Sequence, residues 1–396
     1  MLLIDETLGG NKRPLLDYVR KKVSFVGDPL RLAFLDTLSQ KIIGNPSAKV
    51  FADLSTFAFF CRKRNLCQSV KEIKNSNLKS GWGWVIHIAP SNVAMNFAYS
   101  FLFGFLSGNT NIVRLPSRHW PQVDILINLF DQVLGYEEFA DLRDTFIFIR
   151  TEHDSPWLKA AIRKCDGLMV WGGDETVETF RSVSKIPRCV EMYFPNRKSI
   201  LFLNATEFNA LSTKQKRNLA ERFYNDTYIV DHNACSSPQT IYWIGFKQEI
   251  ESARSVFWNE IIAVNKIKNF ILDPVARIDR YLDVMGQVVN TGKSFVLDQW
   301  ALDIWTQNNS KPDQIFRLGR FNEIYADELA TAIEHLPRGV QTLTYFGFQK
   351  ETLYGYCTKV MSLPDRVVPV GRALDIGFIW DGVNVLERFS KYTSLR

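Results

Sequence analysis

Strand and helix signals alternate through residues 81–172, and this alternation most constrains what the chain can fold into. Trp84 to Ala89 is an almost unbroken apolar run, typical of a strand buried on both faces. Further strand signals at 111–115, 145–149 and 167–171 are separated by stretches with helical patterns. Strand, helix and strand in this order predict βαβ units, and therefore an α/β fold with a parallel sheet.

Short stretches at the ends of these predicted strands are candidates for ligand binding. Ser91 and Asn92 follow the first strand, Arg114 to Ser117 close the second, and Gly172 and Gly173 follow the fourth. Ligands of such sheets bind outside the carboxyl ends of the strands. The Gly-Gly pair could let the backbone approach a phosphate or a nicotinamide, although a plain turn is the alternative. No G-x-G-x-x-G occurs, so the common dinucleotide-binding motif is absent.

Cys235 is the candidate nucleophile of a second region. The polar stretch 231–238 lies between two apolar segments, 228–230 and 240–244, which we expect to be strands. A thiolate in such a turn is a strong nucleophile if its surroundings lower its pKa. The alternative is a small, half-buried core cysteine. His232 could raise the thiolate fraction, or it could be a solvated turn histidine.

Composition excludes several function classes. The net charge of +6 is scattered, which argues against nucleic-acid binding. The six cysteines lack zinc spacing, so no metal site is expected. Asp5 and Glu6 interrupt the apolar start, so no signal peptide is predicted, and no run is long enough for a membrane helix. We therefore expect a cytoplasmic protein with free thiols.

The length of 396 residues predicts two domains. Residues 1–204 are expected to form N-terminal helices and the first α/β domain, and 205–375 the second domain, which contains Cys235. Residues 376–396 are expected to be a C-terminal tail that could serve in oligomerisation. Strands of the second domain are expected near 240–244, 315–319 and 340–346, a strand at 198–204 precedes it, and a charged helix is expected at 206–225.

Several motifs, in order, resemble the aldehyde dehydrogenase superfamily, and within it most closely the LuxC-type acyl-CoA reductases of the bacterial bioluminescence fatty-acid reductase complex. That superfamily has P-W-N followed by A-G-N-T-V-V-x-K-P-x-E. The corresponding residues here are Pro90-Ser91-Asn92 and Ser107 to Ser117, followed by Asn233 to Pro238, Gln341-Thr342, Val368 to Asp375 and Trp380 to Gly382. The resemblance implies an aldehyde-dehydrogenase-like fold, with a Rossmann-type nucleotide-binding domain and an α/β catalytic domain.

The resemblance also implies roles for individual residues. Cys235 is similar to the thiol that carries the acyl group as a thioester. Asn92 is similar to the asparagine that stabilises the oxyanion, although an Asn in this place could also be a helix N-cap. Glu191 stands nearest to the general base of E-L-G-G-K, but the two glycines are missing. A base is needed to hydrolyse the thioester in aldehyde oxidation and not in its reduction, so this departure favours the reductive direction.

Two substitutions bear on the cofactor. Arg114 replaces the lysine and Ser117 replaces the glutamate of the family's adenosine-ribose pair, and Arg118 adds a positive charge. Loss of the glutamate removes the repulsion of a 2′-phosphate, so NADPH is expected, with NADH possible. Ser91, Gly172 and Gly173 complete the expected cofactor site.

The expected function is the NADPH-dependent reduction of an acyl thioester, carried by coenzyme A or a protein, to an aldehyde. Alternatives are an NAD(P)-dependent aldehyde dehydrogenase, an acyl-phosphate reductase, and a nucleotide-binding pseudoenzyme that scaffolds an acyl-activating partner. A homo-oligomer is expected, as is an acyl-activating synthetase or transferase partner. The sequence leaves the acyl chain length and the pathway open.

Overall fold

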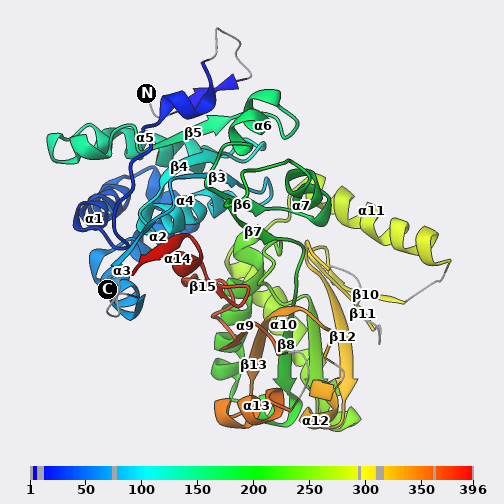
Figure 1. The fold of residues 1–396 in the computed structure, drawn as a ribbon. Coiled ribbons are helices and arrows are strands. Elements are labelled where there is room, and N and C mark those ends of the chain that lie inside the picture. Colours follow the sequence, from blue (N-terminus) through cyan, green and yellow to red (C-terminus); the bar gives the residue numbers. More distant parts are fainter. Residues whose placement is uncertain are drawn as a thin grey trace. The chain divides into compact units, whose positions relative to one another are not determined.

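The computed structural model divides into two compact units (Figure 1). The first comprises residues 1–196 and 376–396, and the second residues 197–375. The residues described are 3–6, 13–73, 78–292, 296–308, 316–334, 336–359 and 363–394.

The first unit is built on a parallel sheet with the strand order β1-β5-β4-β3-β6-β7. From β3 the chain passes outward through β4 and β5, then crosses to β6 and β7 on the other side. The strand order therefore reverses between β3 and β6, where such sheets bind ligands. The predicted α/β fold with a parallel sheet is confirmed. The strands are β1 (Leu3–Asp5), β3 (Trp84–Ile88), β4 (Thr110–Arg114), β5 (Phe146–Arg150), β6 (Gly167–Trp171) and β7 (Val190–Phe194).

Helices cover both faces of this sheet, because side chains alternate along its strands. On β5, Phe146 and Phe148 contact a cluster of phenylalanines from α1, α4 and α5, with Phe101 and Phe146 ring centroids 4.9 Å apart. Ile147 and Ile149 belong to the opposite core, with α6 and α7. The helices are α1 (Pro29–Gly44), α2 (Ala52–Phe60), α3 (Lys63–Ile73), α4 (Asn96–Leu106), α5 (Pro121–Leu134), α6 (Pro156–Ile162) and α7 (Asp174–Arg181).

The C-terminal segment belongs to the first unit. It contains β15 (Ile379–Trp380), β16 (Val383–Asn384), α14 (Val385–Arg388) and β17 (Ser390–Thr393). Strand β17 pairs with β2 (Leu78–Gly81), and the Asn109 side-chain amide donates to the Phe389 carbonyl over 2.8 Å. The segment predicted as a separate tail is therefore packed into the first unit.

The second unit has a sheet with the order β10-β11-β12-β9-β8-β13-β14, parallel except for β10. Its boundary lies after Asn196 and not near 204, because β8 pairs with β9 and β13 of this unit. The strands are β8 (Lys198–Asn204), β9 (Thr240–Ile244), β10 (Leu297–Ala301), β11 (Ile304–Asn308), β12 (Arg320–Ala326), β13 (Val340–Phe346) and β14 (Arg366–Pro369).

Aromatic side chains form the core on one face of the second sheet. Trp243 of β9 packs with Phe223, Phe257 and Trp258 of the helices above it, while Tyr242 faces the other side. The helices are α8 (Ala205–Asn209), α9 (Thr213–Thr227), α10 (Lys247–Ile267), α11 (Pro274–Thr291), α12 (Leu329–Glu334) and α13 (Lys350–Cys357). Within the described ranges, no helix combines the length and apolar character needed to cross a membrane.

Three local predictions are wrong. Residues 228–230 form a 3₁₀ turn instead of a strand, because Asp231 and His232 adopt φ of 51° and 57° and reverse the chain. The strand expected near 315–319 begins at Arg320, after Gly319 with φ of 75°, and residue 315 lies outside the described residues. The helix expected at 206–225 is interrupted before Thr213, where Ser212 forms a capping box.

Candidate functional site

The loops after β3 and β4 are hydrogen-bonded to each other at the carboxyl edge of the first sheet. The Ser117 amide donates to Ser91 Oγ over 3.2 Å, and Trp120 Nε1 donates to the Ser91 carbonyl over 3.3 Å. Strand β3 is central and lies between β4 and β6. The residues expected to bind the cofactor therefore gather on neighbouring strands at the switch point.

Arg114 is buried at this edge. Its Nε donates to the Thr151 carbonyl over 2.9 Å and its Nη2 to Ser117 Oγ over 2.7 Å. Burial lowers the pKa of Arg114 to about 10, while the charge of Glu152 raises it, so the group stays cationic at neutral pH. Arg114 thus orients Ser117, whereas the exposed Arg118 lies 4.2 Å from the Trp120 ring centroid.

Gly172 and Gly173 join β6 to α7. A Cβ on Gly172 would lie 2.8 Å from Thr176 Cγ2, so a side chain there would crowd the first turn of α7. A Cβ on Gly173 would make only ordinary contact, 3.5 Å from the Asn196 side chain. Asp174 already offsets the positive end of the α7 dipole. The helix end itself is therefore a poor anion site, and the glycine at 172 is explained by its close packing against Thr176.

Asn92 lies in the loop after β3, and its residue is exposed. From the sequence, the turn Pro90-Ser91-Asn92 also predicts the cap of a helix beginning near Val93, and this prediction is wrong. Helix α4 begins at Asn96, and its N-cap is Met95, which makes no side-chain cap hydrogen bond. The alternative role of Asn92 as an N-cap is thereby removed.

Glu191 lies away from these loops. It is the second residue of β7, near the amino end of the strand, and its carboxylate accepts from the Tyr193 hydroxyl. Lys185 Nζ lies 3.1 Å from the same carboxylate oxygen. These two partners orient Glu191 within the first unit, and its role as a base stays a prediction.

Cys235 lies in a turn at the amino edge of the second sheet, just before β9. Its carbonyl accepts from Ser199 Oγ over 2.6 Å, and Ser199 Oγ accepts from the Thr342 amide over 3.2 Å. Ser199 and Thr342 stand near the starts of β8 and β13, so the turn is fastened to two strands. Cys235 has intermediate burial. A fixed backbone with a partly accessible thiol suits a nucleophile.

His232 does not serve as the partner of the thiol. It is buried, its Nε2 lies 2.9 Å from the Pro238 carbonyl, and its Nδ1 accepts from the Gly319 amide over 3.3 Å. Burial lowers the pKa of His232 to about 4, and the hydrogen bond to Pro238 only partly offsets this. A neutral ring with both nitrogens engaged holds the turn in place, so neither expectation for His232 is met.

Arg366 is a site residue that the sequence reasoning missed. It begins β14, paired in register with Thr342, and its Nη2 donates to the Ala373 carbonyl over 3.2 Å. Burial lowers the pKa of Arg366, whereas the negative charges of Asp375, Asp226 and the Cys235 thiolate raise it.

Asp226 anchors the segment that holds Arg366. Its two carboxyl oxygens accept from the Gly371 amide over 2.6 Å and the Ala373 amide over 2.8 Å. Burial raises the pKa of Asp226 to about 7, although the two hydrogen bonds oppose this shift. The sequence signal for this segment was the V-P-V-G-R-A-L-D motif at residues 368–375. It contains Gly371 and Ala373, whose backbone amides donate to Asp226.

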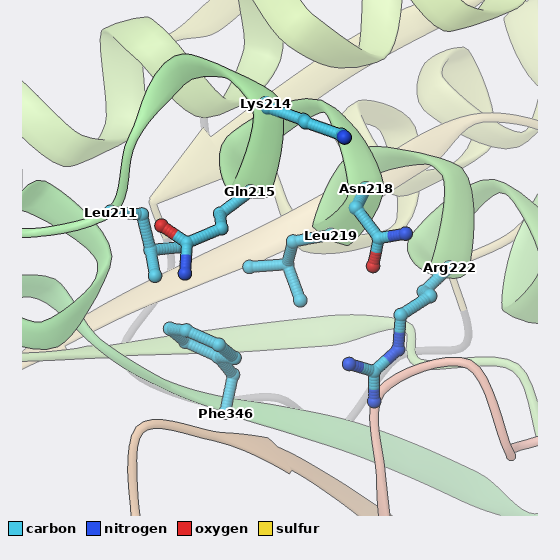
Figure 2. Close-up of a pocket in the computed structure, with 7 residues that line it drawn as sticks. All are labelled: Leu211, Lys214, Gln215, Asn218, Leu219, Arg222 and Phe346. Carbon is cyan, nitrogen blue, oxygen red and sulfur yellow. The ribbon is translucent and has the colours of Figure 1, made fainter.

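A pocket of about 360 Å³ lies elsewhere in the second unit (Figure 2). Figure 2 shows Leu219 and Phe346 facing each other, with Arg222 nearby. Phe346 ends β13, whereas Cys235 precedes β9, so the pocket and the thiol lie at opposite edges of this parallel sheet. Among the described residues, no three His, Cys, Asp or Glu side chains are grouped as a metal site would require.

The sequence model of the acyl-CoA reductase (LuxC) family matches residues 62–296, which is more than half of the chain. The chain belongs to this family. The matched range contains the turn of Cys235 and all three loops at the carboxyl edge of the first sheet, whereas Arg366 lies outside it. Among curated proteins, none matches the chain.

Solved structures place this LuxC-family chain in the aldehyde dehydrogenase fold. Proline utilization A of Bradyrhizobium japonicum is similar with a TM-score of 0.66 at 11% identity, covering 92% of this chain and 42% of that one. The aldehyde dehydrogenase KauB of Pseudomonas aeruginosa has a TM-score of 0.65 at 10% identity, with 92% and 83% covered. The P. syringae indole-3-acetaldehyde dehydrogenase, solved with NAD+, has a TM-score of 0.67 at 9% identity, and the match covers 93% of this chain and 84% of that one. The chain spans less than half of the proline utilization A proteins it matches.

Proposed function

We propose that this LuxC-family chain reduces an acyl thioester to an aldehyde, with NADPH as reductant, through an acyl group carried on Cys235. The observation that carries the proposal is the Cys235 turn. Its backbone is fastened to Ser199 and the residue is only partly buried. We infer from the electrostatic coupling of Arg366 with Cys235 that the guanidinium favours the thiolate. Membership of the acyl-CoA reductase family supports the choice of an acyl thioester as substrate.

The acyl group reaches the protein by thioester exchange. The Cys235 thiolate attacks the acyl carbonyl, a new carbon–sulfur bond forms, and the donor's sulfur leaves as a thiolate. Hydrogen-bond donors must stabilise the oxyanion that forms, and we assign the Asn92 side-chain amide and the Cys235 backbone N–H to this role. After reduction, the hemithioacetal on Cys235 loses its proton, the carbon–sulfur bond breaks, and the free aldehyde and thiolate are released.

The proposed cofactor is a nicotinamide nucleotide, which supplies the hydride when bound. Residues at the carboxyl edge of the first sheet would hold it: Ser91, Ser117 and Arg118, with the backbone at Gly172 and Gly173. The fit rests on the hydrogen-bonded loops at the switch point and on the tight turn at Gly172. A relative of the same fold was solved with NAD+, which supports this class of cofactor.

The choice of NADPH over NADH rests on charge. Ser117 carries no carboxylate to repel a 2′-phosphate, and its hydroxyl accepts from Arg114, which leaves its own proton free to donate. Arg114 is occupied by Thr151 and Ser117, so the exposed Arg118 is the cation we assign to the phosphate. Arg114, which the sequence places in the expected cofactor site, would then orient Ser117.

The proposal gives Glu191 no obligatory role. Reduction ends with an aldehyde, so no water has to be activated at the acyl group. The carboxylate of Glu191 is held by Tyr193 and Lys185, as a structural group would be. An aldehyde dehydrogenase, the main alternative, would need a base free to activate water.

We further propose an acyl-CoA or acyl-protein donor, an acyl-activating synthetase or transferase as partner, and a homo-oligomer. We also propose a cytoplasmic location, which the six free cysteines support.

Intact-mass measurement after incubation with a panel of acyl-CoAs tests the proposal. We expect an acyl adduct on the unmodified protein that disappears, with release of aldehyde, when NADPH is added. The Cys235→Ala variant should form no adduct. Faster adduct formation from acyl phosphates would indicate the acyl-phosphate reductase, and the absence of any adduct would indicate the nucleotide-binding scaffold.

A further inference from the structure

Cys165 and Cys189 bring their sulfur atoms within 3.7 Å of each other in the first unit. Both are free thiols, and neither belongs to the site proposed above. We propose that this pair is a redox modification site, in which a peroxide converts the two thiols reversibly to a disulfide.

The backbone on both sides of the pair is fixed. Cys165 lies just before β6 and Cys189 just before β7, which are neighbouring strands of the parallel sheet. Between them, the Val190 amide donates to the Asp166 carbonyl over 2.9 Å. The Cys189 amide in turn donates to the Ile186 carbonyl over 3.0 Å. The two sulfurs are therefore held in contact by sheet pairing, and a bond between them requires the sulfurs to approach from 3.7 Å to about 2.05 Å.

The two thiols differ as the attacking and resolving cysteines of a redox pair do. Cys165 is fully buried, whereas Cys189 has intermediate burial and can meet an oxidant. The pKa of Cys189 is lowered chiefly by its hydrogen bond with Cys165 and to a smaller extent by the charge of Lys185, although burial and the charge of Glu191 oppose this. The same hydrogen bond, together with burial, raises the pKa of Cys165 well above its usual value. Cys189 is thus the thiolate that reacts with the oxidant, and Cys165 is the thiol that then attacks the oxidised Cys189 sulfur.

Lys185 is a fixed cation at this place. Its Nζ donates to the carbonyls of Phe180, Arg181 and Val183 over 3.1, 3.0 and 2.7 Å, at the end of α7. These contacts and the ion pair with Glu191 fix the ammonium group at the end of α7. Its charge lowers the pKa of Cys189 less than the charge of Glu191 raises it, so the contact with Cys165 is the main cause of the lowered pKa.

The chemistry balances with a peroxide as the only co-reactant. The Cys189 thiolate attacks one peroxide oxygen, the O–O bond breaks, and hydroxide leaves, so Cys189 becomes a sulfenic acid. The Cys165 sulfur then attacks the Cys189 sulfur, the S–O bond breaks, and water carries away the hydroxyl group with the Cys165 proton. Two electrons have passed from the two sulfurs to the peroxide, and an external thiol reverses the step.

A disulfide here would close the crossover that runs from β6 through α7 to β7. That crossover carries Gly172 and Gly173, so oxidation would restrain the turn assigned to the cofactor without occupying it. A link of this kind stabilises mainly by restricting the unfolded chain. We therefore expect a higher melting temperature for the oxidised protein.

The test treats the full chain with hydrogen peroxide in a Cys235→Ser background, which removes the proposed nucleophile. We expect the intact mass to fall by two hydrogen atoms, a linked Cys165–Cys189 peptide, and reversal by dithiothreitol. Adding Cys165→Ser should leave a sulfenic acid on Cys189 that dimedone traps. Adding Cys189→Ser should slow oxidation of Cys165 by about tenfold or more, because that thiol is buried.

Cys61→Ser is the matched control, since Cys61 is equally buried and burial likewise raises its pKa. This variant should form the disulfide normally and show the same rise in melting temperature. Oxidation of Cys67 while Cys165 and Cys189 remain thiols would overturn the proposal, as would a linked peptide that joins Cys189 to another cysteine. These readouts do not use acyl substrates, so they are independent of the proposed reductase activity.

Discussion

Replacing Asn92 by alanine should slow turnover strongly while leaving the free energy of unfolding almost unchanged. Loss of one oxyanion donor lowers turnover by about a hundredfold to a thousandfold, or about 2.7–4 kcal/mol. Asn92 is exposed, and the N-cap of α4 is Met95. Truncation at such a position changes stability by no more than about 0.5 kcal/mol, against about 1 kcal/mol for removal of a true cap.

Asn204→Ala is the matched control. The Asn204 side chain caps α8 by accepting from the Glu207 amide over 3.2 Å, and it donates to the Gly347 carbonyl over 3.2 Å. Its removal should lower the free energy of unfolding by about 1–2 kcal/mol with near-normal turnover per folded molecule. Single-turnover aldehyde formation and urea unfolding would be measured on both variants. A large loss of stability in Asn92→Ala with normal turnover would refute the oxyanion role.

Four further predictions concern the second unit and the cofactor. Cys235→Ala should abolish aldehyde formation and leave nucleotide binding intact, and labelled acyl thioester accumulating on this variant would exclude Cys235 as the acyl carrier. Arg366→Met should move the pH dependence of Cys235 alkylation to higher pH and Arg366→Lys should largely restore it; identical profiles would remove Arg366 from thiolate stabilisation. Ser117→Glu should lower the NADPH preference, measured as the ratio of kcat/KM values, by about 1–3 kcal/mol, and an unchanged ratio would contradict the charge argument. Folding raises the pKa of Asp226 to about 7, so its carboxyl group contributes to the free energy of unfolding near pH 4 and this contribution is lost as pH rises through 7. The loss is at most about 4 kcal/mol. In the Asp226→Asn variant, the urea midpoint should not fall over this pH range.

The central strands of the first unit could be predicted because they are buried on both faces and therefore read as apolar runs. The run expected at 145–149 is β5 at Phe146–Arg150, and the one at 167–171 is β6. Strand β1, at Leu3–Asp5, was not predicted, since three residues are too short for a periodic pattern. It exists because it pairs with β5, a contact distant in sequence.

The turn at Cys235 was predicted correctly, but the structure around it was not. A polar turn at Cys235 could be read from the composition of 231–238, but not the positive φ of Asp231 and His232, which buries the histidine ring against Gly319. Arg366 could not be predicted from the sequence, because β14 is brought toward the Cys235 turn only by the strand order β8-β13-β14. Local pattern carries no information on which strands become neighbours.

The return of residues 376–396 to the first unit reverses the usual order of events during translation. Domains generally fold as they emerge, with the N-terminal one first. Here the second unit is fully synthesised before β17 is available to pair with β2, and before the Phe389 carbonyl can accept from Asn109. The nascent first unit must therefore wait for a segment that is made after the second unit. A ribosome that stopped shortly before residue 376 would release a finished second unit joined to an incomplete first unit, a natural substrate for chaperones and proteases.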